Sequence, residues 1–190
     1  MFEIVLQMAG GANILHQETT ARRERPVDAG EHSAGRRLVM DGIERYAQED
    51  RQHFDEAVKK AEQLARDPLQ QLLVFVGLFI DMTDQLEEPF PGCLYASYCY
   101  QSGAISKETM ARMEEMMHFW RRRLGEKIEE VRAMYPPRIP VETYQVADHV
   151  LTTFEGAFVL SKLMGEPKLA SQQLIQCRNC LELLFTPDSG

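Results

Sequence analysis

The segment VETYQVADHVLTTFEGAFVLSKLMG, residues 141–165, decides the fold because it is apolar on more than one face over the length of a helix. Its apolar residues are Tyr144, Val146, Ala147, Val150, Leu151, Phe154, Ala157, Phe158, Val159, Leu160 and Leu163. A surface helix of a monomer has no use for two apolar faces. The segment therefore predicts a helix that packs into a bundle and also meets a second surface.

Two further helices are predicted on either side of this segment. The last helix, 168–185, follows Pro167 and spreads its apolar residues over a broad arc. Upstream, Ser106 begins a helix that ends before the prolines after Tyr135. Its core-facing stripe consists of Met110, Met113, Met117, Trp120, Leu124, Ile128 and Val131. Both helices extend the bundle.

The first half of the chain continues the helical pattern. An amphipathic helix is expected from Leu38 to the Asp67-Pro68 break, and a buried helix from Leu69 to Glu88. A strand is the competing interpretation of residues 72–80, but the length and the absence of flanking turn residues favour a helix. A turn and a short segment, 93–102, follow. The fold class is all-α, a bundle of about six helices.

Residues 1–37 differ from the remainder, residues 38–190, which we expect to form one domain. The first 37 residues lack sustained periodicity, and we interpret them as irregular or weakly structured. Their five arginines balance five acids, so the body carries the whole net charge of −8. An acidic body argues against non-specific nucleic-acid binding, since cations placed against phosphates dominate DNA affinity.

Composition also limits the cellular setting. The longest apolar stretch is far shorter than the roughly 20 residues that a membrane span requires. The N-terminus lacks the basic flank of a secretory signal, and four cysteines in a chain with a sizeable core fit reduced thiols. We expect a cytoplasmic protein that does not contact membrane.

Three short patterns then occur in order: FPGCL at 90–94, FWR at 119–121 and FEGAF at 154–158. Together with the order of the helices they resemble the C-terminal body of TetR-family transcriptional regulators, over about residues 38–185. The resemblance implies a homodimer built from the last two helices of each subunit. It also implies a small, largely apolar effector among the central helices.

The resemblance assigns residues to both roles, although any one of them would also suit an ordinary core. The ligand-binding candidates are Phe75, Phe79, Met82, Tyr98, Met113, Met117, Trp120 and Phe154. The dimer-interface candidates are Gly156, Ala157, Phe158, Leu160, Ile175 and Leu181. The glycine and alanine would allow two backbones to approach closely.

The family's DNA-binding head is not recognisable here. Members begin with a helix-turn-helix, whereas residues 1–37 contain no positioned recognition helix. DNA would be a partner only if a head is present or is supplied by a partner subunit. Two alternatives remain: a head-less interaction module that forms mixed dimers, and a metal-binding helical-bundle enzyme.

Polar residues on apolar stripes are candidates for contacts with a polar end of the ligand: Asp50, His53 and His149. Solvated positions, or polar groups satisfied at a helix junction, are the competing interpretation.

Other patterns predict little chemistry. Asp50-x-x-His53 and Glu115-x-x-His118 resemble half of a di-iron motif, but the second pair should face outward. Cys177-x-x-Cys180 should be apolar filler on one helix face. With no phosphate loop, nucleophile elbow or HExxH motif, we expect no enzymatic activity, no metal and no cofactor.

Overall fold

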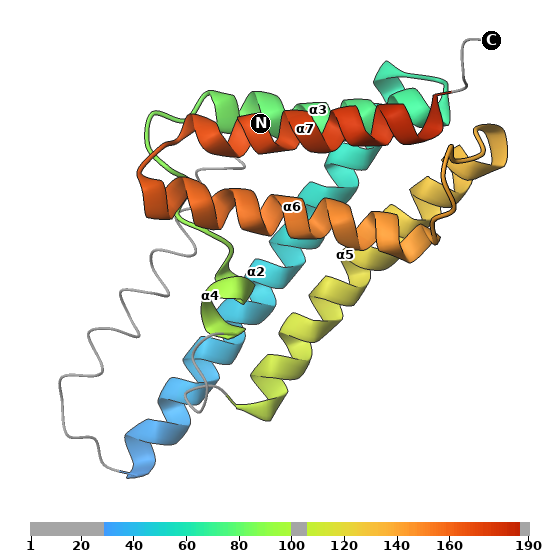
Figure 1. The fold of residues 1–190 in the computed structure, drawn as a ribbon. Helices are drawn as coiled ribbons and strands as arrows, with labels where there is room; N and C mark the ends of the chain where they lie inside the picture. The colour runs from blue at the N-terminus through green and yellow to red at the C-terminus, as the bar shows by residue number, and fades with distance from the viewer. Residues whose placement is uncertain (1–28, 100–105, 187–190) are drawn as a thin grey trace. The chain divides into compact units, whose positions relative to one another are not determined.

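The structure, a computed structural model of the chain, describes residues 29–99 and 106–186. Within these residues it contains helices and no strand (Figure 1). The helices are α2 (Ala29–Leu64), α3 (Pro68–Asp84), α4 (Leu94–Cys99), α5 (Lys107–Met134), α6 (Thr143–Met164) and α7 (Lys168–Phe185). The prediction of an all-α bundle of about six helices is confirmed.

Helix boundaries follow the sequence signals except at two ends. Helix α2 begins at Ala29 and not at Leu38. Gly30 and Gly35 disfavour a helix and residues 29–37 carry no apolar stripe, but the alanine, glutamate and arginine residues of this segment favour one. Helix α3 ends at Asp84, before the predicted Glu88. Pro89 disfavours a helix at Glu88, and the chain already leaves the α-helical pattern earlier, where the Leu86 amide donates to the Thr83 carbonyl three residues back. Of the segment 1–37 that we interpreted as irregular, residues 1–28 lie outside the described residues.

The described residues group into two compact units. Unit 1 contains α2 as far as His53 together with Pro91–Met116, and so includes α4. Unit 2 contains Phe54–Phe90 and the chain from Met117 onward. Helices α3, α6 and α7 lie entirely in unit 2, where α7 packs along both α3 and α6 (Figure 1).

The start of α3 is fixed by Asp67. Its carboxylate accepts a hydrogen bond from the Gln70 backbone amide at 2.9 Å and another from the hydroxyl of Tyr135, while Pro68 occupies the first turn. Burial acts to raise the pKa of Asp67, but these hydrogen bonds outweigh it and hold the pKa below its ordinary value. One carboxylate thus connects the start of α3 to the end of α5.

Replacing Asp67 with Ala is expected to lower the free energy of unfolding by about 1 kcal/mol at neutral pH, since the helix loses its N-cap acceptor. A carboxylate whose pKa is lowered by folding stabilises above its unfolded pKa, and that contribution disappears as the pH falls through the folded pKa. The difference between variant and wild type should therefore shrink below about pH 4. Urea unfolding at pH 7, 5 and 4 measures it; a difference that grows on acidification would contradict this assignment.

Candidate functional site

A series of aromatic ring contacts runs through unit 2 from α2 to α6. Phe54 lies 5.2 Å from Phe75, Phe75 5.2 Å from Phe79, and Phe79 5.0 Å from Phe154, measured between ring centroids. Phe154 in turn lies 6.5 Å from Phe158. The rings meet edge to face or tilted, as aromatic pairs prefer. The structure therefore brings together three of the predicted ligand residues, Phe75, Phe79 and Phe154.

The remaining ligand candidates are divided between the two units. Met82, Met117 and Trp120 belong to unit 2 and are half-buried. Met113 belongs to the core of unit 1 and is buried. The side chain of Tyr98 lies outside the described residues. Phe75 is also buried, whereas Phe79 and Phe154 keep part of their surface exposed.

Unit 1 contains a buried polar group between α2 and α4. Tyr46 and Asp50 lie four residues apart on one face of α2, and the Tyr46 ring packs against Tyr95 of α4 with centroids 5.5 Å apart. Only 3% of Asp50 and 3% of Tyr95 are exposed. Burial, together with the charge of Asp50, raises the pKa of Tyr95 far above its usual value. Asp50 is thus not in a solvated position.

The two histidine candidates differ in their surroundings. His53 is half-buried one turn beyond Asp50, and its Nδ1 is shielded from solvent with no hydrogen-bond partner among the described residues. His149 on α6 is exposed, as the solvated interpretation predicted. Sequence reasoning missed Tyr95 because it comes from another helix, whereas Tyr46 could have been found at helical spacing from Asp50.

The residues of the possible metal motif and of the cysteine pair lie in different environments in the structure. Glu115 and His118 are both exposed, as predicted. Among the described residues there is no group of three or more His, Cys, Asp or Glu placed to hold a metal ion. Cys177 is buried, and burial raises the pKa of its thiol to about 11. Cys180 is exposed, so the prediction that it is core filler was wrong.

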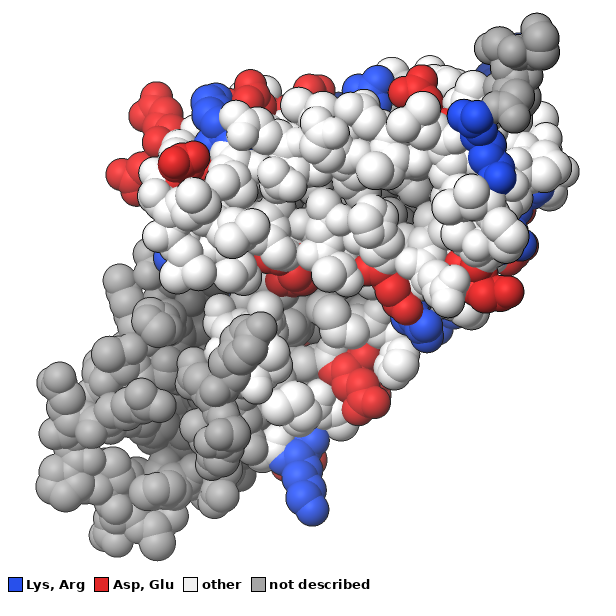
Figure 2. Space-filling model, in the orientation of Figure 1, with Lys and Arg blue, Asp and Glu red and all other residues white. Residues whose placement is uncertain are grey.

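Helices α6 and α7 present a largely uncharged outer face. Figure 2 shows the surface over these helices largely free of Lys, Arg, Asp and Glu, which gather toward its edges. On α6 the exposed residues Gly156, Val159, Leu160, Leu163 and Met164 recur at helical spacing, and on α7 Ile175 and Leu183 do so. Leu163 is 78% exposed and Leu183 is 63% exposed. Exposed large apolar side chains in such a row mark interaction surfaces.

Only some of the predicted dimer residues lie on this surface. Gly156, Leu160 and Ile175 lie on the exposed face. Ala157, Phe158 and Leu181 are buried inside the subunit, with 2%, 9% and 1% of their surface exposed. The prediction for these three needs correction, because their side chains point into unit 2, where Phe158 packs on Phe90 and Phe154.

Local signals fix the ends of α6 and hence the position of this face. Glu142 and Gln145 form a capping box at its start, each side chain accepting a hydrogen bond from the other residue's backbone amide. At its end Gly165 adopts a left-handed conformation with φ of 69°, which favours glycine. Pro167 then lies at the N-cap position of α7, directly before Lys168.

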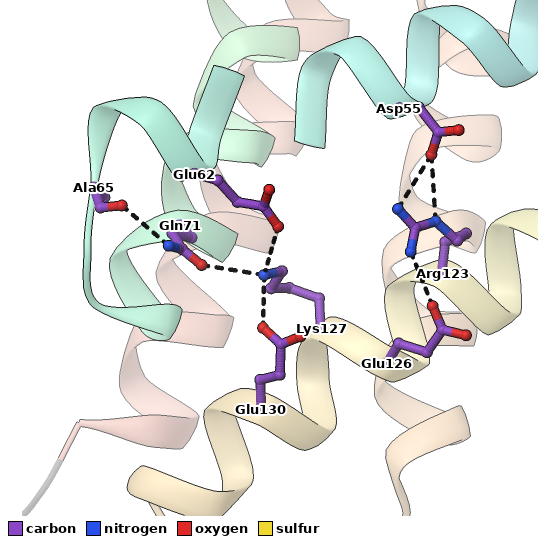
Figure 3. Close-up of polar contacts among 8 residues, drawn as sticks. All are labelled: Asp55, Glu62, Ala65, Gln71, Arg123, Glu126, Lys127 and Glu130. Carbon is purple, nitrogen blue, oxygen red and sulfur yellow. Dashed lines mark hydrogen bonds and ion pairs between the residues drawn. The ribbon is translucent and has the colours of Figure 1, made fainter. Parts of the chain in front are cut away.

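An ionic network joins α2, α3 and α5 within unit 2 (Figure 3). The Lys127 ammonium donates to Glu62 at 3.2 Å, to Gln71 at 3.1 Å and to Glu130 at 2.6 Å. Only 13% of the Lys127 side chain is exposed. Gln71 also donates to the Ala65 carbonyl, which closes the α2–α3 turn.

The neighbouring arginines Arg121 and Arg123 on α5 are paired with acidic residues of other helices. Arg123 contacts Asp55 of α2 at 3.2 Å and Glu126 at 3.0 Å (Figure 3). Arg121 binds Asp148 of α6 with two hydrogen bonds.

Replacing Lys127 with Met is expected to lower the free energy of unfolding by about 1–3 kcal/mol, because three acceptors lose a shared charged donor in a largely buried position. Lys59 is an exposed lysine on α2, and Lys59→Met should change stability by less than about 0.5 kcal/mol. Urea denaturation followed by circular dichroism measures both. Coincident curves for the two variants would show that the network adds nothing.

Comparisons with known proteins agree with this architecture. The family model described as "Tetracyclin repressor-like, C-terminal domain" matches residues 68–175, which is more than half of the chain. A crystal structure of a TetR-family transcriptional regulator from Agrobacterium tumefaciens has a similar fold, with a TM-score of 0.67 and 13% sequence identity over 97% of each chain. A search of curated proteins gave no match.

No helix in the described part of the chain is long and apolar enough to cross a bilayer. Outside residues 68–175 the chain is similar to the solved structure in fold alone, because a sequence identity of 13% is too low to support a statement about function. The family-model match and the fold of the chain both agree with a TetR-type C-terminal domain. The chain belongs to the TetR family of transcriptional regulators, and residues 68–175 form its tetracyclin repressor-like C-terminal domain.

Proposed function

We propose that this chain is the effector-binding and dimerisation body of a TetR-like regulator, which works in the cytoplasm as a homodimer and senses a small, largely apolar ligand. The observation that carries the proposal is the largely uncharged outer face of α6 and α7 with its rows of exposed apolar side chains. A regulator that dimerises through these helices would bury such a face, whereas a monomer would leave it exposed to water.

The occupant of this face is a second copy of the chain. An isologous interface needs one patch that is complementary to itself. Two adjacent helices with apolar rows can meet the same two helices of another subunit as a four-helix bundle. Gly156 allows a close approach of the backbones, while Leu160 and Leu163 supply apolar area. Each side chain of this kind that becomes fully buried contributes up to roughly 1.5–3 kcal/mol to the free energy of association. Because the dimer is two-fold symmetric, each such contribution occurs twice.

The apolar part of the ligand would contact the aromatic series of unit 2. Phe79 and Phe154 are in contact yet only half-buried, and Met82 and Met117 are flexible enough to repack around a guest. Aromatic and methionine side chains together suit an adaptable apolar site. Sensing then requires that the ligand prefer one of two dimer geometries, since equal affinity for both shifts nothing.

Two measurements on the full chain test the two halves of the proposal. Sedimentation velocity over a range of protein concentrations should give the mass of a dimer; a monomer at all concentrations would overturn the interface. A thermal-shift panel of small apolar compounds, comprising cations, neutral molecules and anions, should include compounds that raise the melting temperature. A dimer that no compound stabilises would contradict the sensing role and leave the dimer interface standing.

A further inference from the structure

We propose that the second copy of the chain docks with its α7 antiparallel to α7 of the first, on a two-fold axis that passes at Gln176. This inference rests on the dimer of the proposed function and specifies how the two copies align. Each Gln176 amide then binds the Gln176 amide of the second copy, while Gln172 of one copy faces Asn179 of the other.

The first argument is a row of side-chain amides on the outer face of α7. Gln172, Gln176 and Asn179 follow one another at helical spacing and are exposed, and Leu183, 63% exposed, continues this amide row. In the described part of the chain no hydrogen bond joins the three amides to another residue. The charged residue one turn before the row, Lys168, is paired with Asp84 of α3 at 3.7 Å. The amide row therefore offers free donors and acceptors without a net charge.

The second argument is that amides suit a two-fold axis. In an isologous interface a residue on the axis meets its own copy. Two carboxylates or two ammonium groups would repel each other there, and leaving them unpaired in an interface is costly. An amide carries an acceptor oxygen as well as donor N–H groups, so it can bind an identical amide. The amide row is thus complementary to itself.

The third argument is the position of Gln176 relative to Gly156. The chain from 156 to the end of α6 at 164 is as long as the chain from the start of α7 at 168 to 176. Because α6 and α7 pack side by side as a hairpin (Figure 1), Gly156 and Gln176 lie at the same level. A Cβ at Gly156 would have no neighbour within 4 Å in its own subunit. One axis perpendicular to both helices can therefore pass over both residues, where the glycine lets α6 approach its own copy.

The first test places charges on the axis. Gln176→Glu and Gln176→Lys should each raise the dissociation constant of the dimer by about tenfold to a hundredfold, because like charges then meet. An equimolar mixture of the two variants should form a mixed dimer about tenfold or more tightly than either forms its own. Gln173→Glu and Gln173→Lys, at an exposed position off the amide row, should dimerise like the wild type both alone and mixed. Sedimentation equilibrium measures all of these constants.

A second test reads the alignment through a distance. A disulfide requires Cα atoms no more than about 7 Å apart. With the exposed Cys99 and Cys180 both replaced by serine, Gln176→Cys should give a disulfide-linked dimer in oxidised glutathione. Leu183→Cys in the same background should not, because a rise of about 1.5 Å per residue puts its two copies about 20 Å apart.

The outcomes separate the alignment from the dimer itself. A wild-type chain that stays monomeric would overturn the proposed dimer together with this alignment. A wild-type dimer whose two charged variants do not recover on mixing, or which crosslinks through Leu183→Cys and not through Gln176→Cys, would overturn the alignment and leave the dimer standing.

Discussion

Introducing aspartate at both Leu160 and Leu163 is expected to convert the proposed dimer into a monomer. Both side chains lie in the exposed row of α6, 47% and 78% exposed in the single subunit. In a two-fold interface each substitution occurs twice, and each buried, unpaired carboxylate costs several kcal/mol. The dissociation constant should therefore rise by more than about a thousandfold. Sedimentation equilibrium of the variant and wild type at matched concentrations measures the change.

The matched control for this experiment is Gln173→Asp on α7. Gln173 is exposed, but it lies off the row formed by Ile175 and Leu183, so an added charge there should leave the dimer intact. Far-UV circular dichroism should show the same helix content in all three proteins. A double variant that still sediments as a dimer would place the interface elsewhere.

Replacing Phe75 with Ala is expected to lower the free energy of unfolding by about 3–5 kcal/mol, the usual cost of truncating a buried phenylalanine. Phe75 is only 5% exposed and sits between Phe54 and Phe79 in the aromatic series. Phe75→Leu retains most of the volume and should cost about 1–2 kcal/mol. Chemical denaturation of both variants checks these values.

Phe79→Ala provides the comparison that separates core from ligand contact. Phe79 is half-buried, so its truncation should cost less stability than that of Phe75 and should weaken binding of apolar compounds. Equal and small effects at both positions would show that the ring contacts do not form a core. We expect Phe75→Ala mainly to lower the free energy of unfolding and Phe79→Ala mainly to weaken the binding of apolar compounds.

Sequence predicted the fold where the signals are local. Helix α7 begins and ends where Pro167 and its apolar arc placed it, and α3 begins with the Asp67-Pro68 pair. The start of α2 at Ala29 was missed because residues 29–37 have no apolar period and include Gly30 and Gly35, which disfavour a helix.

The site was predicted less completely, because its features depend on neighbours that are distant in sequence. The burial of Asp50 involves Tyr95 from α4, which no spacing along α2 could reveal. Two apolar faces on α6 were recognised, but sequence could not decide which face turns inward. The sequence analysis therefore assigned the buried Phe158 to the proposed dimer interface and omitted the exposed Leu163, which is equally apolar.

The division of the chain into two interleaved units has a consequence for how the protein can be cut. The family-model match, 68–175, begins after Phe54 and Ala61 and ends before Leu181 and Phe185, all of which are buried. A polypeptide trimmed to that match would expose a large part of its own interior. Because α2 and α5 each supply residues to both units, neither unit is one continuous stretch of sequence. The segment that matches the family model is therefore not a unit that would fold by itself, and a shortened protein should keep α2 and α7 whole.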